Sequence, residues 1–524
     1  MDGKAKAKAK AWERRTAYLT LLLVLLAFAL RAYHLDFQSL WRDEVDALRF
    51  ATRPFSELLA TFTRVGENGP LYFLLLRGWL ALTGQSEFAL RYLSLLGGVL
   101  SVPLTVALGR RLAGPRAALL GGLFVATSPY LVWYSQEGKM YGLLVSLVLA
   151  ALWAFWEALN RGGWGRWALC WLLTTLALYV HVLAALLIAV QAVWFLVACL
   201  VRPRTRRQIV PLLTVLALLT LPYLPIARWL IRLWQRPGFQ TGHPFVPLGT
   251  MLTTLLWGFS RDVPGDSPLW TLLPFVFLLL AGVALGWKKG EKEKEGKERT
   301  EGTEGTERHE EDLRCAICDL RFANCDWRLG IGYLLSWLLL PPLALYLISL
   351  HKPLFADRYL IWIAPAFTLL LAAGLAAVWR RWRPLAAALL ALVVALNLQA
   401  VWGQAHTVIK SDFRRAAAYV EPRRAPDEAL LFLMPYVRHT YSYYADGPSP
   451  WADAPYTNGG ATPEDVAAKL ARLTAGRPAV WLISSEAELW DRRGLVVAWL
   501  EAHATRTDEA DFERVHVARY ALSP

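Results

Sequence analysis

Long apolar blocks recur along the chain and limit its fold more than any other feature of the sequence. An α-helix rises about 1.5 Å per residue, so about 20 apolar residues cross the roughly 30 Å hydrocarbon core of a bilayer. In lipid, every backbone polar group must be bonded within the protein, which favours helices. Hydrophobic residues make up 56% of the 524 residues. We therefore predict a polytopic α-helical membrane protein with about 11 transmembrane helices. The predicted spans are 17–33, 87–109, 117–134, 141–159, 167–183, 185–201, 209–227, 269–287, 329–349, 359–379 and 384–401.

Clusters of arginine and lysine lie in alternate connections between these spans. They are Arg110, Arg111 and Arg116; Arg161 and Arg166; Arg202, Arg204, Arg206 and Arg207; Lys288 and Lys289; and Arg380, Arg381 and Arg383. Positively charged loops stay in the cytoplasm, so we expect these connections and the N-terminus to be cytoplasmic. The first apolar block is interpreted as a retained span, because no small-residue cleavage site follows it. We attribute the formal charge of +14 to basic loops that contact anionic lipid headgroups. We therefore expect no nucleic-acid partner.

One apolar block, Pro70 to Thr83, is short for a span and carries Arg77. If it crossed the membrane, every later arginine cluster would move to the outside. We therefore predict a juxtamembrane or re-entrant helix inside a long first outer loop, residues about 34–86. By the same count, the acidic motif SLWRDEVDALRF at 39–50 faces the extracytoplasmic side.

The composition divides the chain into two domains. Residues 1–401 are predicted to form the transmembrane domain and residues 402–524 a small extracytoplasmic α/β domain, since strand-like and helix-like patterns alternate there. Its expected strands are 429–433, 479–484 and 514–520, and its expected helices are 411–421, 463–474 and 490–503.

A charged, repetitive segment, residues about 288–328, interrupts the transmembrane domain and is predicted to be a disordered cytoplasmic linker. It ends with three cysteines near His309, at Cys315, Cys318 and Cys325. They could form a zinc knuckle. A single Cys-x-x-Cys pair is weak evidence for such a site, so we expect an incidental insertion.

Polar side chains gather at the predicted outer ends of the helices. Carboxylates and cations at one membrane face suit a site that binds an anionic lipid headgroup and deprotonates a second substrate. Purely structural roles are the alternative: Asp46 could begin a helix, Glu137 and Lys139 could form a structural ion pair, and His181 could be a hydrogen-bonded interfacial residue. The set comprises Asp36, Arg42, Asp43, Glu44, Asp46, Glu67, Asn68, Arg91, Tyr134, Glu137, Lys139, Tyr141, Tyr179, His181, His351, Lys352, Asp357, Arg358 and Tyr359.

The order of these motifs resembles a known enzyme group. SLWRDEVDALRFA, then NGPLYFLLLRGWLALTGQSEFALRYLSLL, SPYLVWYSQEGKMYGLL, YVH and FADRYLIWIAPAF follow one another along the chain. The series is similar to membrane glycosyltransferases of the GT-C fold. It looks closest to the RgtA/B/C/D-like group, related to protein O-mannosyltransferases and to the aminoarabinose transferases that modify lipid A.

The resemblance implies a reaction and roles for particular residues. A polyprenyl-phosphate-linked sugar would be the donor, and the acceptor would be a hydroxyl of a glycan, lipid or protein at the extracytoplasmic face of the bacterial cytoplasmic (inner) membrane. Asp43 would be the general base with Glu44 beside it, and a single displacement would invert the anomeric centre. The resemblance puts cations on the leaving phosphate, which Arg91, Lys139 and Arg358 would supply. We also expect substrate contacts from Tyr134, Glu137, His181 and Asn68.

Two further expectations concern cofactors and alternatives. Relatives commonly carry His-Pro-Pro-Leu where this chain has Asn68-Gly69-Pro70-Leu71, so a role that needs histidine is in doubt at Asn68. We expect no cofactor and no metal ligand; a divalent ion on Asp43, Glu44 and Asp46 is the disfavoured alternative. A membrane glycosyltransferase, of hexosyl or pentosyl units, is thus predicted. The alternative is a lipid-linked sugar transporter or flippase, which would need broken helices and midplane polar residues.

Overall fold

The computed structural model describes residues 3–62, 69–201, 203–236, 242–261, 268–284, 327–445, 447 and 450–522. The chain forms two compact units. The membrane unit comprises residues 1–34, 53–84 and 91–405, and the α/β unit comprises residues 35–52, 85–90 and 406–524. The predicted linker and its cysteine cluster lie almost entirely outside the described residues.

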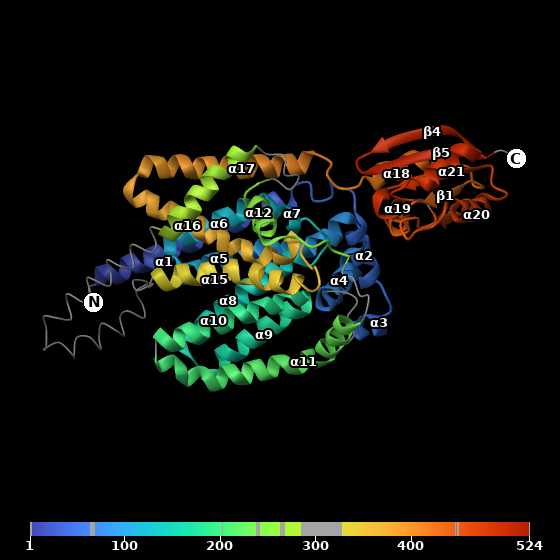
Figure 1. The fold of residues 1–524 in the computed structure, drawn as a ribbon. Coiled ribbons are helices and arrows are strands. Elements are labelled where there is room, and N and C mark those ends of the chain that lie inside the picture. The colour runs from blue at the N-terminus through green and yellow to red at the C-terminus, as the bar shows by residue number, and fades with distance from the viewer. Residues whose placement is uncertain are drawn as a thin grey trace, which may run out of the picture. The chain divides into compact units, whose positions relative to one another are not determined.

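The membrane unit is built from helices (Figure 1). They are α1 (Gly3–Ala32), α3 (Phe55–Ala60), α4 (Pro70–Thr83), α5 (Glu87–Leu112), α6 (Gly114–Thr127), α7 (Pro129–Ser135), α8 (Tyr141–Arg161), α9 (Trp164–Val180), α10 (Leu186–Val201), α11 (Ile209–Gln235), α12 (Leu248–Ser260), α15 (Trp327–Ser349), α16 (Ala364–Arg381) and α17 (Arg383–His406). Helix α5 begins at Glu87, so its first residues belong to the α/β unit.

Seven helices among the described residues are long and apolar enough to cross a membrane, or eight if the bent pair α6 and α7 is one span. The predicted spans 167–183, 209–227 and 269–287 also overlap helices, namely α9, α11 and the shorter apolar helix Leu269–Ala284. The fold class expected from the sequence is therefore confirmed. The block at Pro70 forms a 14-residue helix. The side of the membrane on which each helix ends stays a prediction.

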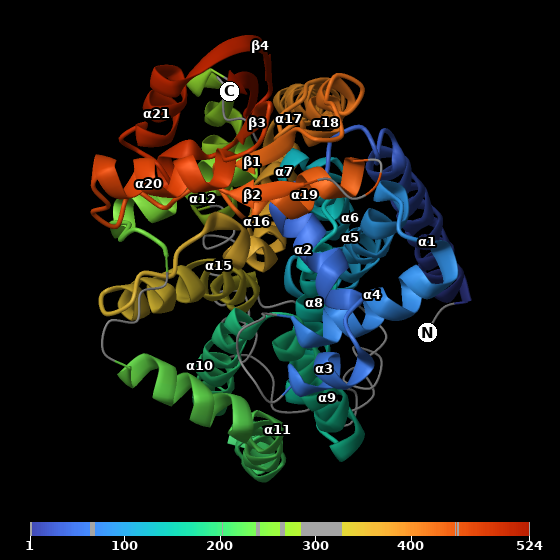
Figure 2. The same cartoon turned by 90° about the vertical axis from the view of Figure 1, so that its right-hand side faces the viewer.

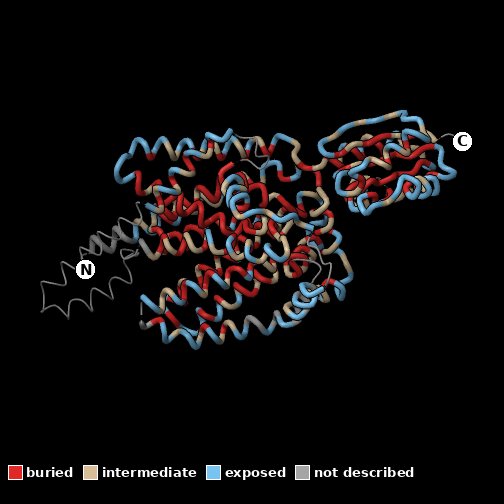
Figure 3. The backbone as a smooth tube through the Cα atoms, viewed as in Figure 1, coloured by how far each residue is buried: buried red, intermediate tan, exposed pale blue. Residues whose placement is uncertain are grey.

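Glycines allow α5 and α8 to approach closely. A Cβ added to Gly97 would lie 2.7 Å from the backbone carbon of Gly142, closer than real Cβ atoms come. Small residues at such crossings let helix backbones pack against each other in membranes. Burial is greatest around α8 and α16, and the candidate span Asp357–Arg381 is buried along its whole apolar window (Figure 3).

The α/β unit contains a five-stranded sheet in the order β2-β1-β3-β5-β4 (Figure 2). The strands are β1 (Ala429–Phe432), β2 (Trp451–Asp453), β3 (Ala479–Ser484), β4 (Ala504–Phe512) and β5 (Val515–Leu522). Strand β1 pairs in parallel with β2 and β3, whereas β5 pairs antiparallel with β3 and β4. Its helices are α2 (Arg42–Ala51), α18 (Phe413–Val420), α19 (Val437–Tyr444), α20 (Pro463–Thr474) and α21 (Leu495–His503).

The alternation of side chains along the strands creates two cores. Leu430 and Phe432 pack with α18 and α19, while Leu431 packs on the opposite face with α20 and α21. Successive strand residues point to opposite faces, so one continuous apolar run serves both layers. The result is a three-layer α/β/α arrangement.

The sequence predicted this sheet in part. Three strands and three helices lie where they were expected, although the helix expected at 490–503 begins only at Leu495 as α21. Strands β2 and β4 and helix α19 were not predicted. Strand β4 is an edge strand with mostly polar, exposed residues, so it lacks the apolar alternation that marks a strand.

Candidate active site

The candidate base Asp43 lies in the first turn of α2. Trp41 precedes the helix in an extended conformation, and its amide donates to the Glu44 carboxylate at 3.5 Å. That bond satisfies a backbone donor at the helix start, where negative charge is also favoured by the helix dipole. The Asp43 side chain is 21% exposed and lies 3.9 Å from Arg42 Nε. It therefore remains partly open to solvent.

Glu44, the neighbouring acid, is completely buried. Its Oε2 accepts a hydrogen bond from Lys410 Nζ at 3.0 Å, and Lys410 is only 7% exposed. A buried carboxylate needs such a partner, because a lone charge in a low-dielectric interior is strongly unfavourable. The two predicted catalytic acids thus differ: Asp43 is accessible, whereas Glu44 anchors α2.

The third acid of the motif, Asp46, lies in the second turn of α2. Its Oδ1 accepts from Arg49 at 3.1 Å on an exposed face. The helix already begins at Arg42, so Asp46 does not start it.

In the membrane unit, the third predicted span is broken. Helices α6 and α7 meet at Ser128 with a bend of 56°. Pro129, the first residue of α7, has no N–H group, so the Val125 carbonyl lacks the donor that a continuous helix would provide. The Ser128 hydroxyl accepts from the Leu131 amide at 3.3 Å and caps α7.

Arg31 of α1 supplies the missing donors. This side chain is fully buried, and its Nη2 and Nη1 donate to the Val125 and Ala126 carbonyls at 3.1 and 3.0 Å. Its Nη1 and Nε also donate to the Ala27 carbonyl and to the Ser135 hydroxyl at 3.3 and 3.2 Å. Arg31 therefore joins the end of α6 to the end of α7.

Helix α7 directs two tyrosines at one carboxylate. The hydroxyls of Tyr130 and Tyr134 donate to Asp357 Oδ2 at 3.1 and 3.2 Å. Asp357 begins the 3-10 helix η4 (Asp357–Ile363), and the next residue is Arg358. The ring centroid of Tyr141 lies 5.4 Å from that of Tyr134 and 6.3 Å from that of His181. Tyr134 and His181, two of the predicted substrate-binding residues, therefore have a common neighbour in Tyr141.

His181 lies between α9 and the 3-10 helix η1 (Val182–Ala185) and is 1% exposed. Its Nδ1 accepts from the Leu183 amide at 3.3 Å, so in the neutral ring the proton is on Nε2. Within the described chain Nε2 has no hydrogen-bond partner. The ring centroid lies 5.3 Å from that of Tyr359 and 6.3 Å from that of Tyr141. A buried donor without an acceptor suits an incoming ligand oxygen.

The remaining predicted residues occupy different positions. Arg91 lies in the second turn of α5 and is 1% exposed, and Glu137, in the turn after α7, is 3% exposed. Lys139 is half-buried in that turn, with its amide bonded to the Glu137 carbonyl at 2.7 Å. Asn68 lies outside the described residues.

Comparisons with known proteins were made on sequence and on structure. Residues 67–229 match the sequence family described as dolichyl-phosphate-mannose-protein mannosyltransferase. No curated protein matches the chain in sequence. ArnT from Cupriavidus metallidurans, in a crystal structure with bound undecaprenyl phosphate, superposes with a TM-score of 0.54 at 14% identity, covering 97% of this chain and 98% of ArnT. Oligosaccharyltransferase AglB from Archaeoglobus fulgidus, in complex with an inhibitory peptide and a dolichol-phosphate, gives 0.54 at 13% identity over 98% and 74%.

The chain is a GT-C fold membrane protein. Its fold is similar to that of ArnT, and its residues 67–229 are similar to the protein mannosyltransferases, in line with the sequence resemblance. Tyr134, His181 and Arg358 belong to its membrane unit, where the first two have Tyr141 as a common ring neighbour, and Asp43 and Glu44 belong to its α/β unit.

Three structural residues of this GT-C protein were not predicted. Arg31 stands at the end of the first apolar block and looks there like an interfacial residue. Lys410 lies in an irregular stretch, 366 positions from Glu44. Asp357 was noted in the polar set but not assigned to the two tyrosines. The sequence carries a local signal for one related feature: Pro129 after Ser128 marks the helix break whose carbonyls Arg31 binds.

Possible metal ligands were compared over the part of the chain that the structure describes. No group of three or more histidine, cysteine, aspartate or glutamate side chains there is arranged to hold a metal ion. Glu44 is bound to Lys410 and Asp46 to Arg49, so each has a protein cation as partner.

Proposed function

We propose that the protein transfers a sugar from a polyprenyl-phosphate-linked donor to an acceptor hydroxyl at the extracytoplasmic face of the membrane. The observation that carries this is Asp43, a partly exposed carboxylate at a helix start, in a chain whose fold is that of ArnT. The acceptor is a glycan, lipid or protein, and the transferred unit is a hexose or pentose.

Asp43 acts as the general base. It takes the proton from the acceptor hydroxyl as the oxygen forms a bond to the anomeric carbon of the donor. The bond between that carbon and the phosphate oxygen breaks at the same time, and the electron pair leaves with the polyprenyl phosphate. One displacement of this kind inverts the anomeric configuration. General-base catalysis typically contributes about 10²- to 10⁴-fold to the rate.

The leaving phosphate gains charge in this step, and cations offset it. Arg91, Lys139 and Arg358 supply this charge, the two arginines through a forked pair of N–H groups and the lysine as a point charge. The buried Nε2 of His181 donates to an oxygen of the donor sugar or phosphate, a role that fits its lack of a partner in the described chain. Glu137, Tyr134 and Asn68 supply further contacts to the substrate.

The bound lipid phosphates of ArnT and AglB support the choice of donor class. A lipid carrier also fits the many exposed apolar side chains of the membrane unit, since these face a bilayer. Glu44 supports α2 through Lys410, which assigns it a supporting role beside Asp43.

The test supplies the purified full-length protein with a panel of polyprenyl-phosphate sugars and acceptors. Asp43→Asn is expected to lower kcat at least 100-fold while donor binding is kept. Asp46→Asn is the matched control, because it removes the same charge from the same helix; its activity is expected to stay within about threefold of wild type. Full activity in Asp43→Asn would overturn the assignment of the base.

A lipid-linked sugar transporter is the second candidate, because the broken span α6 and α7 is a feature that transporters use. The same preparation separates the two functions. Protein-dependent movement of the lipid-linked sugar across vesicles, with no glycosidic product from any donor, would favour the transporter.

A further inference from the structure

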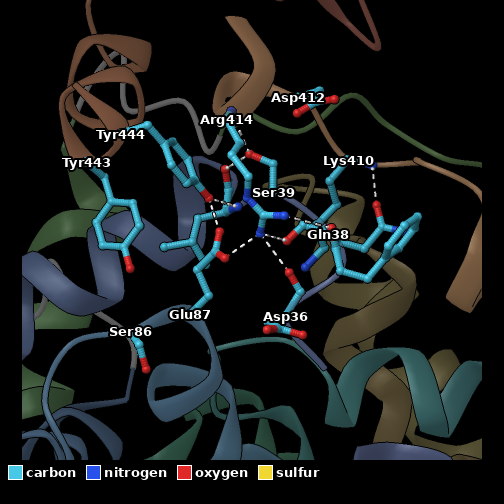
Figure 4. Close-up of polar contacts among 12 residues, drawn as sticks. Asp36, Gln38, Ser39, Ser86, Glu87, Lys410, Asp412, Arg414, Tyr443 and Tyr444 are labelled. Atoms are coloured by element: carbon cyan, nitrogen blue, oxygen red, sulfur yellow. Dashed lines mark hydrogen bonds and ion pairs between the residues drawn. The ribbon is translucent and has the colours of Figure 1, made fainter. Parts of the chain in front are cut away.

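Three segments far apart in sequence meet within the α/β unit. They are the segment Asp36–Leu40 before α2, the start of α5 at Glu87, and the stretch from Thr407 to Tyr444 (Figure 4). Between them they make a dense set of polar contacts. Because Asp43 follows Asp36–Leu40 by three residues, the position of this segment governs the position of the candidate base.

Arg414 is the centre of the contacts. Its guanidinium forms an ion pair with the Glu87 carboxylate and donates to the carbonyls of Asp36 and Phe37 at 2.7 and 3.3 Å. It also donates to the Gln38 carbonyl at 3.4 Å. Carbonyls of three successive residues therefore share one planar donor group, which fixes both the place and the direction of the segment.

Tyr444 connects the same two segments. Its hydroxyl accepts from the Leu40 amide at 2.7 Å and donates to the Glu87 carboxylate. Burial, and then the adjacent Glu87, raise the pKa of Tyr444, so the hydroxyl keeps its proton at neutral pH. Tyr443 adds a bond from its hydroxyl to the Gln85 carbonyl at 2.9 Å.

The Gln38 side chain bonds the same segment to the backbone of residues 407–410. Its side-chain oxygen accepts from the amides of Ile409 and Lys410 at 3.0 and 3.3 Å, and its nitrogen donates to the Thr407 carbonyl at 2.7 Å. The Ser39 hydroxyl accepts from the Arg414 amide at 3.3 Å. Each residue from Asp36 to Leu40 is thus held by the C-terminal part of the chain.

We propose that Arg414 and Tyr444, with Glu87, are positioning residues that fix the segment Asp36–Leu40 so that the α/β unit sets where Asp43 stands. The inference rests on the proposed function. It gives the C-terminal domain a direct part in transfer, beyond covering the site or binding acceptor. A displacement of about 1 Å at a reacting group can cost about 100-fold in rate, so loss of these contacts acts on catalysis.

The experiment uses the full-length protein with Tyr444→Phe and Arg414→Ala. Tyr444→Phe removes one hydroxyl and is expected to lower kcat about tenfold, and Arg414→Ala about 100-fold, with the donor KM within about twofold of wild type. Arg415→Ala is the matched control, because the Arg415 side chain is 69% exposed. It is expected to leave kcat and the unfolding midpoint unchanged.

A second measurement does not depend on turnover. Hydrogen–deuterium exchange of the peptide that covers 36–44 is expected to become at least tenfold faster in Tyr444→Phe, while β1 and β3 keep wild-type protection. Arg414→Lys keeps the charge opposite Glu87 but loses the fork, so it is expected to restore the unfolding midpoint more than kcat.

The possible results separate the two proposals. Wild-type kcat in both variants, or unchanged exchange at 36–44, would overturn the positioning role. A kcat loss that only follows the loss of folded protein would do the same, because it marks a purely structural role. If Asp43→Asn is active while 36–44 loosens and kcat falls in Tyr444→Phe, the base assignment fails and the segment positions another group.

Discussion

Arg31 in the membrane unit and Lys410 in the α/β unit are both buried cations, but their partners differ. Lys410 donates to the Glu44 carboxylate at 3.0 Å. The acceptors of Arg31 among the described residues are three backbone carbonyls and the Ser135 hydroxyl. One charge is balanced by an opposite charge, and the other by a set of neutral oxygens.

The position of Arg31 explains why neutral oxygens suffice. Two of its carbonyls belong to the last turn of α6, where the helix dipole carries partial negative charge and where carbonyls lack their normal donors. A guanidinium can satisfy several of them in one plane, which an ammonium cannot do. The break at Pro129 and the buried Arg31 therefore form one structural feature: the break provides acceptors for the guanidinium, and the guanidinium provides donors for the carbonyls at the break.

The largest effect on stability is expected for Lys410→Met. This change removes the Lys410 ammonium from the buried Glu44 carboxylate and is expected to destabilise the folded protein by about 3–5 kcal/mol. The measurement is the unfolding free energy of the full-length protein in detergent.

The double variant Glu44→Leu with Lys410→Met sharpens the same point. Removing both charges is expected to restore most of the lost stability, since no uncompensated charge remains. The Trp41 amide then lacks its cap, so the recovery stays about 1 kcal/mol short. A double variant as unstable as Lys410→Met would contradict the assignment of the loss to a stranded charge.

A smaller effect is expected for Arg31→Met, about 2 kcal/mol, because it leaves the Val125 and Ala126 carbonyls without donors but strands no charge. Apart from the Ser135 hydroxyl, its partners are backbone carbonyls, and no second substitution can remove those. Arg31→Lys is expected to recover less than half of the loss, since an ammonium lacks the fork. Unfolding midpoints in detergent of the two variants test this. Wild-type stability in Arg31→Met would mean that the carbonyls at the break have other donors.

These two cations also mark the limit of prediction from sequence. Apolar blocks of spanning length specify helices through local composition, and alternation along 429–433 and 479–484 specifies central strands, so these elements were predicted correctly. Lys410 and Glu44 are 366 positions apart, and no local pattern connects them. The sequence flagged Asp43 and His181 as polar residues beside apolar runs. That His181 Nε2 is buried without a partner in the described chain depends on packing from several helices.

Glu428, in the α/β unit, is a carboxylate that has both a charged and a neutral hydrogen-bond donor as partners. It accepts from Trp481 Nε1 at 2.9 Å and from Arg519 Nε at 3.1 Å. Burial by itself would raise the pKa of Glu428, but the hydrogen bonds from Arg519 and Trp481 outweigh it, so this pKa lies below its ordinary value. A folded-state pKa below the unfolded one stabilises the fold above the unfolded pKa, and this stability is lost as the pH falls through the folded value.

Glu428→Gln is therefore expected to cost about 1–2 kcal/mol at pH 7, because an amide is a weaker acceptor for Arg519. The difference from wild type is expected to shrink as the pH falls below the ordinary pKa of glutamate and then through the lower folded-state pKa, because Glu428 itself then takes up a proton. Unfolding midpoints at pH 7, 5 and 3 test the trend. Glu509→Gln, at an exposed pair with Arg506, is the control and is expected to show little difference at any of these pH values. A Glu428→Gln difference that is constant with pH would contradict a lowered pKa.

The smallest effect is expected where the charge is exposed, at Asp46 and Arg49 on α2. Their side chains are 27% and 44% exposed and one turn apart, so water competes for both charges. Asp46→Asn and Arg49→Gln are each expected to change the unfolding free energy by about 0.5 kcal/mol or less, and less still at 1 M salt. Lys410→Met, by contrast, is expected to keep its full effect at 1 M salt, because salt screens a buried pair much less. A loss in Asp46→Asn as large as that in Lys410→Met would mean that burial does not set the strength of these pairs. The control in the transfer assay would then have to move from Asp46 to another acid of the α/β unit.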